Sequence, residues 1–123
     1  MVFAFDFGSA TPLYRQIRDQ VVMAIADGTL KEGERLPTIR ALADESGINM
    51  MTVSKAYQLL KQEGYILTDR RSGAAVAPRK GAPGIMPETE ERLRLCISEL
   101  RLAGFGKKET IALCEQIFEE AEK

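Results

Sequence analysis

Few side chains in this sequence could carry out covalent or metal chemistry. The 123 residues include no histidine, and the two cysteines, Cys96 and Cys114, are not at a metal-ligand spacing. Each cysteine lies among apolar residues at helical intervals, which favours packing as a small hydrophobic side chain over a redox switch. The sequence also lacks a glycine-rich phosphate loop and a paired nucleophile and base. We therefore expect no catalytic residue, no metal and no enzymatic activity.

The side chains that could bind phosphate are arginines and lysines whose positions matter more than their number. The formal net charge is −1, but residues 1–80 carry 11 Lys and Arg against 9 Asp and Glu, whereas residues 81–123 carry 6 against 9. The first part therefore has a charge of +2 and the second of −3. Because the basic excess is small, attraction for an anionic polymer would depend on local placement of basic side chains.

Residues 36–64, which would position many of these side chains, are typical of two helices joined by a tight turn. Gly47 can take the positive φ that ends a first helix at 38–46, and Asn49 is a good N-cap for a second helix at 50–63. Both helices have apolar residues at helical spacing: Ile39, Leu42 and Ala43, then Val53, Ala56, Tyr57 and Leu60. This pattern fits a helix-turn-helix, which places its second helix in the DNA major groove. From this segment alone, an ordinary helical hairpin is the alternative.

A short basic hairpin is expected directly after the helix pair. Residues 65–68 and 74–77 are compatible with strands, and a glycine-containing turn separates them. The turn contains Arg70, Arg71, Ser72 and Gly73. A helix-turn-helix followed by a hairpin is a winged helix, in which the hairpin is the wing. Two adjacent arginines can form a mere solvated turn, but this position favours contact with DNA phosphates or the minor groove.

The N-terminal residues are expected to add an arm and one more helix. Alternating aromatic residues predict a short strand or an extended arm that packs on a neighbouring element: Phe3, Phe5 and Phe7. Thr11 is the expected N-cap of a helix that begins at Pro12 and ends near Gly28. The side chains expected to face solvent on this helix are Arg15, Gln16, Arg18 and Gln20.

A linker and a two-helix tail complete the predicted organisation. Residues 78–87 contain three prolines and two glycines, so they predict a linker between a winged-helix domain at 1–77 and a helical hairpin at 88–123. Two short amphipathic helices, at 88–103 and 107–121, cannot bury both apolar stripes alone, which favours a dimerisation bundle with a second copy. The expected interface residues are Leu93, Cys96, Ile97, Leu100, Ile111, Cys114, Ile117 and Phe118. The alternative is that the hairpin folds back on its own winged helix.

The fold class is therefore mainly α with a small β-hairpin, and the motifs resemble those of a known family. PLYRQI (12–17), GTLKEGERLPTIRALA (28–43), GINMMTVSKAYQLL (47–60) and EGYI (63–66) are similar to GntR-family transcriptional regulators. The short two-helix tail resembles that of the YtrA-like subfamily. The sequence departs from the family pattern at Met50 and Met51, where polar or basic residues are frequent, and at Ala75, where an aromatic is common.

The resemblance implies a set of DNA-contacting residues at the start of the helix pair. Carried over by position, they are Arg40, Asn49, Met50, Met51, Thr52, Ser54 and Lys55, with Arg35 and Thr38 as backbone contacts beside them. Their chemistry agrees with this role. Arginine can bind guanine O6 and N7 with two hydrogen bonds, and Asn, Thr and Ser can reach phosphates or base edges from a helix N-terminus.

The implied function is a dimeric, sequence-specific regulator of transcription, most directly a repressor, on an inverted repeat in double-stranded DNA. The half-sites would lie roughly 34 Å apart. No cofactor is expected, because the aminotransferase-like domain that binds pyridoxal phosphate in a related branch is absent from this sequence. An effector of unknown identity would bind in the dimer cleft or at the linker, because the tail is too small to enclose a sizeable metabolite. The alternative is a winged-helix module that docks proteins without reading DNA. With no signal peptide or membrane span in the sequence, we expect a cytoplasmic protein with no membrane partner.

Overall fold

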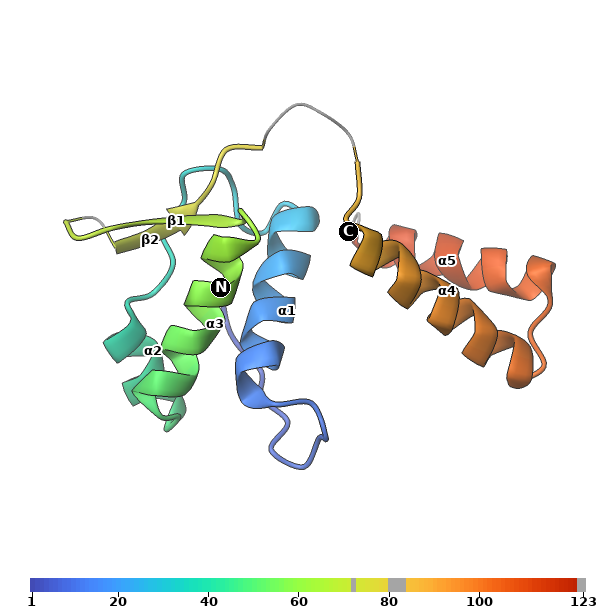
Figure 1. Ribbon diagram of the computed structural model, residues 1–123, viewed down its shortest axis with the longest axis horizontal. Coiled ribbons are helices and arrows are strands. Elements are labelled where there is room, and N and C mark those ends of the chain that lie inside the picture. Colours follow the sequence, from blue (N-terminus) through green and yellow to red (C-terminus); the bar gives the residue numbers. More distant parts are fainter. Residues whose placement is uncertain (72, 80–83, 122–123) are drawn as a thin grey trace. The chain divides into compact units, whose positions relative to one another are not determined.

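The computed structural model describes residues 1–71, 73–79 and 84–121, and the chain divides into two compact units, Met1–Arg79 and Lys80–Lys123. The first unit contains α1 (Leu13–Ala26), α2 (Ile39–Ser46), α3 (Met50–Gln62), β1 (Ile66–Asp69) and β2 (Gly73–Val76) (Figure 1). The second contains α4 (Pro87–Leu102) and α5 (Lys107–Ala121). The predicted fold class, mainly α with a small β-hairpin, is confirmed.

The core of the first unit is built around α3, which packs against α1, α2 and β1. Its largest fully buried side chains are Ile17 and Val21 from α1, Val53 and Leu60 from α3, and Ile66 from β1. Burial of such side chains contributes about 1.5–3 kcal/mol each. The helical spacing of the apolar residues on α1 and α3 is therefore what brings these helices together.

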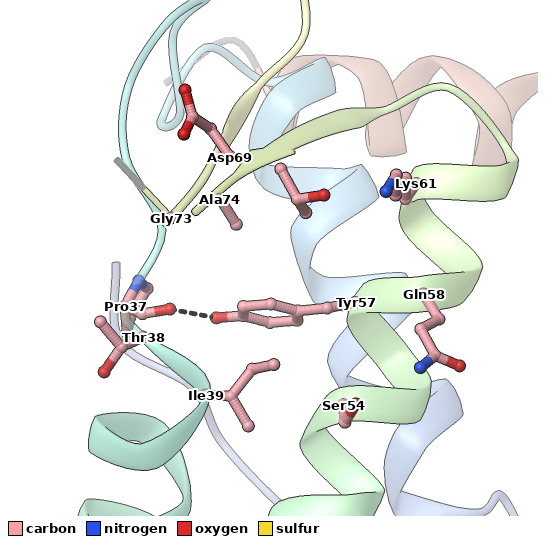
Figure 2. A pocket seen from close by; sticks show the side chains of 11 residues that line it. Pro37, Thr38, Ile39, Ser54, Tyr57, Gln58, Lys61, Asp69, Gly73 and Ala74 are labelled. Carbon is pink, nitrogen blue, oxygen red and sulfur yellow. Dashed lines mark hydrogen bonds between the residues drawn. The ribbon is translucent and has the colours of Figure 1, made fainter. Parts of the chain in front are cut away.

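The joint between α2 and α3 has the glycine end and the asparagine cap that its sequence predicts, while Thr38, expected as the first helical residue, is the N-cap of α2. Thr38 caps α2, with its Oγ1 accepting a hydrogen bond from the Ala41 amide at 3.1 Å, and Gly47 ends the helix at φ 68°. Asn49 caps α3, with its Oδ1 accepting from the Met51 amide at 2.7 Å. The Tyr57 hydroxyl on α3 then donates to the Pro37 carbonyl at 2.7 Å, which ties α3 to the segment entering α2 (Figure 2).

The N-terminal arm is held by two glutamine side chains of α1. The Ala4 amide donates to Gln20 Oε1 at 2.9 Å, and Gln20 Nε2 donates back to the Ala4 carbonyl at 2.6 Å. Gln16 makes the same pair of hydrogen bonds with the backbone of Asp6, both at 2.9 Å. The predicted extended arm is present. The two glutamines do not face solvent as expected, because their side-chain amides form paired hydrogen bonds with the backbone of the arm. The predicted N-cap Thr11 is also wrong, since Pro12 occupies that position and no side chain caps α1.

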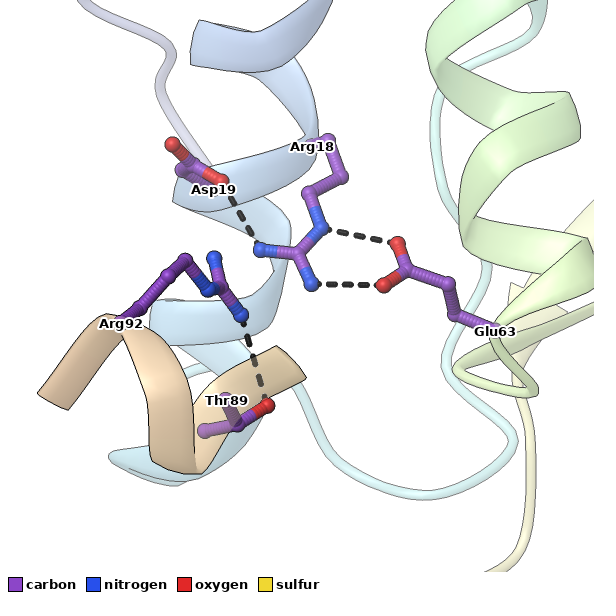
Figure 3. Close-up of polar contacts among 5 residues, drawn as sticks. All are labelled: Arg18, Asp19, Glu63, Thr89 and Arg92. Carbon is purple, nitrogen blue, oxygen red and sulfur yellow. Dashed lines mark hydrogen bonds and ion pairs between the residues drawn. The ribbon is translucent and has the colours of Figure 1, made fainter. Parts of the chain in front are cut away.

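Arg18 is buried rather than exposed, which is a second correction to the expected outer face of α1. Its Nε and Nη2 donate to the two carboxylate oxygens of Glu63 at 2.9 and 2.8 Å, and Nη1 donates to Asp19 at 2.9 Å (Figure 3). The hydrogen bond to Glu63 raises the pKa of Arg18 against the opposing effect of burial, and the bond to Asp19 raises it further. The guanidinium also lies 5.7 Å from the ring centroid of Tyr65. These contacts join α1 to the residues that follow α3.

The hairpin pairs Ile66 with Val76 and Asp69 with Gly73, so each strand is shifted by one residue from the predicted runs at 65–68 and 74–77. The segment before α2 binds along β2. The Leu36 amide donates to the Ala74 carbonyl, and the Val76 amide to the Glu34 carbonyl, both at 2.9 Å. The hairpin is thus attached to the entry of the helix-turn-helix.

The second unit is a pair of helices without an internal core. Within Pro87–Leu102 and Lys107–Ala121, all of which the structure describes, no side chain is buried. Leu93 is 55% exposed and Phe118 is 69% exposed, while Leu100 is half-buried. In the described ranges 1–71, 73–79 and 84–121, no helix is long and apolar enough to cross a membrane.

Candidate nucleic-acid interface

The outward surface of α3 forms a ridge of side chains at helical spacing. We call Met51, Ser54, Lys55, Gln58 and Lys61 the α3 ridge; Ser54 is half-buried and the others are exposed. Their spacing of three or four residues places them on the face opposite Val53, Ala56 and Leu60, which fill the core. The ridge therefore leaves one full face of α3 open to a partner.

A hollow lies on the α1 side of this ridge, and we call it the α1-side hollow. Tyr14 of α1 forms one wall, and Met51, Ser54, Lys55 and Gln58 are among its other lining residues. Lys55 Nζ lies 4.1 Å from the centroid of the Tyr14 ring. This cation–π contact holds the Lys55 ammonium over the Tyr14 ring on the α1 side of the ridge.

A second hollow, which we call the wing-side hollow, lies on the other side of the ridge and has a volume of about 360 Å³. Figure 2 shows its walls, which come from the start of α2, from α3 and from the turn end of the hairpin. The buried ring of Tyr57 lines it, and burial raises the pKa of this phenol to about 12. Ser54 and Gln58 line both hollows, so they lie on the crest between them.

The structure brings several of the predicted contact residues to the two hollows. Met51, Thr52, Ser54 and Lys55 line the α1-side hollow, and Thr38 and Ser54 line the wing-side hollow. The remaining members of the set around the helix pair are exposed: Arg35, Arg40, Asn49 and Met50. Because the Thr38 and Asn49 oxygens already cap helices, these two residues would act on an anion through the positive helix ends that they stabilise.

The turn of the hairpin presents its basic residues to solvent. Arg70 and Arg71 are exposed, and Asp69 Oδ1 accepts a hydrogen bond from the Arg71 amide at 2.7 Å. Gly73 has φ 73°, a left-handed conformation that favours glycine at this corner. Ser72, the other predicted contact in this turn, lies outside the described residues.

Three surface residues were missed by the sequence analysis. Gln58 and Lys61 follow Ser54 at four and seven residues, so helical spacing alone could have assigned them to the same face. Tyr14 is on a different helix, and no local pattern in the sequence indicates that its ring meets Lys55. Such a contact depends on how α1 packs against α3.

Comparisons with known proteins agree with this architecture. The family described as bacterial regulatory proteins, gntR family, matches residues 13–76. The chain is 36% identical over 102 residues to the HTH-type transcriptional repressor YtrA of Bacillus subtilis, which covers 80% of this chain and 78% of that protein. A solved YtrA from Sulfolobus acidocaldarius, a GntR-family transcription factor, is 36% identical with a TM-score of 0.65, covering 83% of this chain and 99% of that one. A structure of a transcriptional antiterminator from Listeria monocytogenes EGD-e is 29% identical with a TM-score of 0.89, covering 100% and 94%.

Some matches cover only part of this chain. The chain is 46% identical over 66 residues to the Escherichia coli regulator YdcR, but this match spans 14% of that protein and 54% of this chain. The DNA-binding domain of AraR, solved in complex with operator ORX1, has the same fold at 22% identity and a TM-score of 0.55. With the family match over residues 13–76 and the YtrA match over most of both proteins, this chain belongs to the GntR family of bacterial regulatory proteins and is a YtrA-like member of it.

Proposed function

We propose that the protein is a sequence-specific DNA-binding transcription regulator that represses from an inverted-repeat operator as a homodimer. The observation that carries this proposal is the open α3 ridge, with a hollow on each side and two exposed arginines at the hairpin turn. Bacillus subtilis YtrA is named a repressor, and the AraR domain of the same fold binds an operator. Such an activity would take place in the cytoplasm.

The dimensions of the surface support insertion of α3 into DNA. A helix with its side chains is about 10–12 Å across, and the major groove is about 12 Å wide. With the first part of the α3 ridge, Met51 to Lys55, on the groove floor, Arg40 at the start of α2 can reach a guanine edge with two hydrogen bonds. The exposed Met50 and Met51 offer apolar contact, which suits thymine methyl groups.

Exposed apolar side chains in the second unit support the homodimer. Ile97 is 40% exposed, Ile111 46%, Ile117 54% and Phe118 69%. These residues lie among those predicted for the interface, and a second copy of the hairpin can cover them with the same face. A dimer also supplies two winged-helix domains, one for each half-site of an inverted repeat.

The test is selection of duplex DNA by the purified protein at two salt concentrations, followed by titration of the enriched sequence. We expect an inverted repeat, bound more weakly as salt rises. Arg40→Ala should abolish specific binding while the dimer persists in light scattering. The matched variant Arg40→Lys keeps the positive charge but cannot form the two parallel hydrogen bonds to guanine. It should therefore lose about 5–150-fold in its preference for the correct base pair at one operator position.

Two results would contradict the proposal in different ways. Unchanged specific binding by Arg40→Ala would remove this residue from the interface. Weak binding of wild-type protein without sequence enrichment would favour the alternative, a winged helix that docks a protein.

A further inference from the structure

The wing-side hollow lies between two features that the proposed function assigns to DNA. The first part of the α3 ridge, Met51 to Lys55, would enter the major groove, and Arg70 and Arg71 at the hairpin turn would reach the adjacent minor groove. Adjacent grooves of a duplex are separated by one sugar–phosphate strand, so this strand must cross the surface between α3 and the hairpin. We propose that the wing-side hollow binds this strand, with Lys61 as the phosphate contact and Thr68 beside it. This inference rests on the proposed function and adds a binding site to it.

The lining of the hollow matches the chemistry of a deoxyribose–phosphate strand. Ile39, the Tyr57 ring and Ala74 supply apolar surface for the sugar. Thr38, Ser54 and Thr68 supply hydroxyl groups, and Lys61 supplies an ammonium group. Lysine, serine and threonine side chains are regular donors to DNA phosphates. The Tyr57 hydroxyl already donates to the Pro37 carbonyl, so the ring, rather than the hydroxyl, faces the strand.

Two lining residues of opposite charge give the proposal a sharp test. Lys61 comes from the last turn of α3, and Asp69 comes from the end of β1. Asp69 Oδ1 accepts the Arg71 amide, so its carboxylate shapes the turn while it adds a negative charge to the same hollow. A bound phosphate would be attracted by the first residue and repelled by the second. Removing each charge should therefore shift DNA affinity in opposite directions.

The experiment measures binding of the selected operator by wild-type protein and by Lys61→Gln over a range of salt. For each occupied hollow, the variant should bind the operator about fivefold more weakly at 0.15 M salt. The slope of log binding constant against log salt concentration should become shallower by about 0.9 for each hollow. The loss should be equal for operator and base-substituted duplexes, because a phosphate contact carries no sequence information. Asp69→Asn keeps an acceptor for the Arg71 amide and should bind more tightly than wild type.

The matched control is Lys31→Gln, which removes the same charge from an exposed lysine that does not line the hollow. Thermal unfolding of each variant checks that the fold is retained. Ethylation of individual DNA phosphates then locates the contact. Ethylation of one phosphate between the half-site and its flank should weaken DNA binding by the wild-type protein. The same ethylation should not weaken DNA binding by Lys61→Gln any further.

The possible results separate this inference from the proposed function. Equal effects of Lys61→Gln and Lys31→Gln would overturn the hollow as a strand site while leaving DNA reading intact. A sequence-dependent loss in Lys61→Gln would also overturn it, because Lys61 would then contact bases. Failure of wild-type protein to select any duplex would overturn both proposals.

Discussion

The two units of this protein differ in where their apolar side chains lie. In Met1–Arg79, Val53 and Leu60 are completely buried in a core that also contains residues from α1 and β1. In α4 and α5, which the structure describes in full, no side chain is buried, and Leu102 is 90% exposed. The first unit thus has its own core, whereas the second leaves its apolar side chains exposed. In the proposed function, DNA reading and dimerisation therefore belong to different parts of the chain.

The first unit also exposes apolar side chains, but in a different setting. Met51 is 79% exposed and Leu67 is 59% exposed, yet both lie beside a filled core. An isolated helical hairpin has no such core, and short helices are marginally stable in water without tertiary packing. We therefore expect the order of the second unit to depend on association far more than that of the first.

The largest expected effect comes from a charge placed on the exposed face of α5. Ile117→Asp should convert the dimer to a monomer, because a carboxylate cannot be buried between apolar helices without a large desolvation cost. Loss of the second winged-helix domain should weaken operator binding by about 10²–10⁴-fold. Sedimentation and DNA titration measure the two effects.

Gln116→Asp is the matched control, since it adds the same charge one residue earlier on the exposed surface of α5. It should remain a dimer and bind the operator. A dimeric Ile117→Asp protein with normal operator affinity would show that the dimer interface lies elsewhere. The exposed apolar side chains of α5 would then not be the surface that distinguishes the second unit as the site of association.

The next largest effect is a test of the core itself. Leu60→Ala should reduce the free energy of unfolding of the first unit by about 2–5 kcal/mol, because it leaves a cavity at a fully buried position. Leu95→Ala makes the same chemical change on α4, where the side chain is 61% exposed. It should lower the free energy of unfolding by less than about 0.5 kcal/mol. Urea denaturation measures both. A comparable cost at Leu95 would mean that this residue is also covered by a partner.

The sequence predicts the helix-turn-helix well because its signals are local. Gly47 and Asn49 act on backbone groups within four residues, and those contacts are present in the structure. The apolar period of α3 likewise identifies the buried face, and with it the ridge on the other side. Boundaries of helices and strands therefore agree with the predictions within one or two residues.

Contacts between distant residues could not be predicted in this way. Arg18 and Glu63 are 45 residues apart, and a lone arginine on an otherwise polar helix face gives no sign that it will be buried. Gln16 and Gln20 bind the backbone of the arm, which depends on where the arm lies. For α4 and α5 the periodicity predicts two amphipathic helices, but it does not identify the surface that covers them.

The smallest effect that we predict is a pH dependence confined to the first unit. Tyr57 is 3% exposed, and burial raises the pKa of its phenol to about 12 from the ordinary value near 10. A pKa that is higher in the folded state gives stabilisation that is fully present below pH 10 and is lost as the pH rises towards 12. The loss should approach about 2–3 kcal/mol near pH 12, because each pKa unit corresponds to 1.36 kcal/mol.

Tyr57→Phe isolates this contribution because Tyr14 and Tyr65 remain in both proteins. At pH 7 the variant should be about 1 kcal/mol less stable, since it lacks the hydrogen bond to the Pro37 carbonyl. As the pH rises above 10 the wild-type protein should lose its advantage and become the less stable of the two, because phenylalanine cannot ionise. Urea denaturation at intervals between pH 7 and pH 11.5 measures the crossing. A constant difference between the two proteins would mean that the phenol ionises as readily in the folded state as in the unfolded state, and that the wall of the wing-side hollow formed by Tyr57 is open to water.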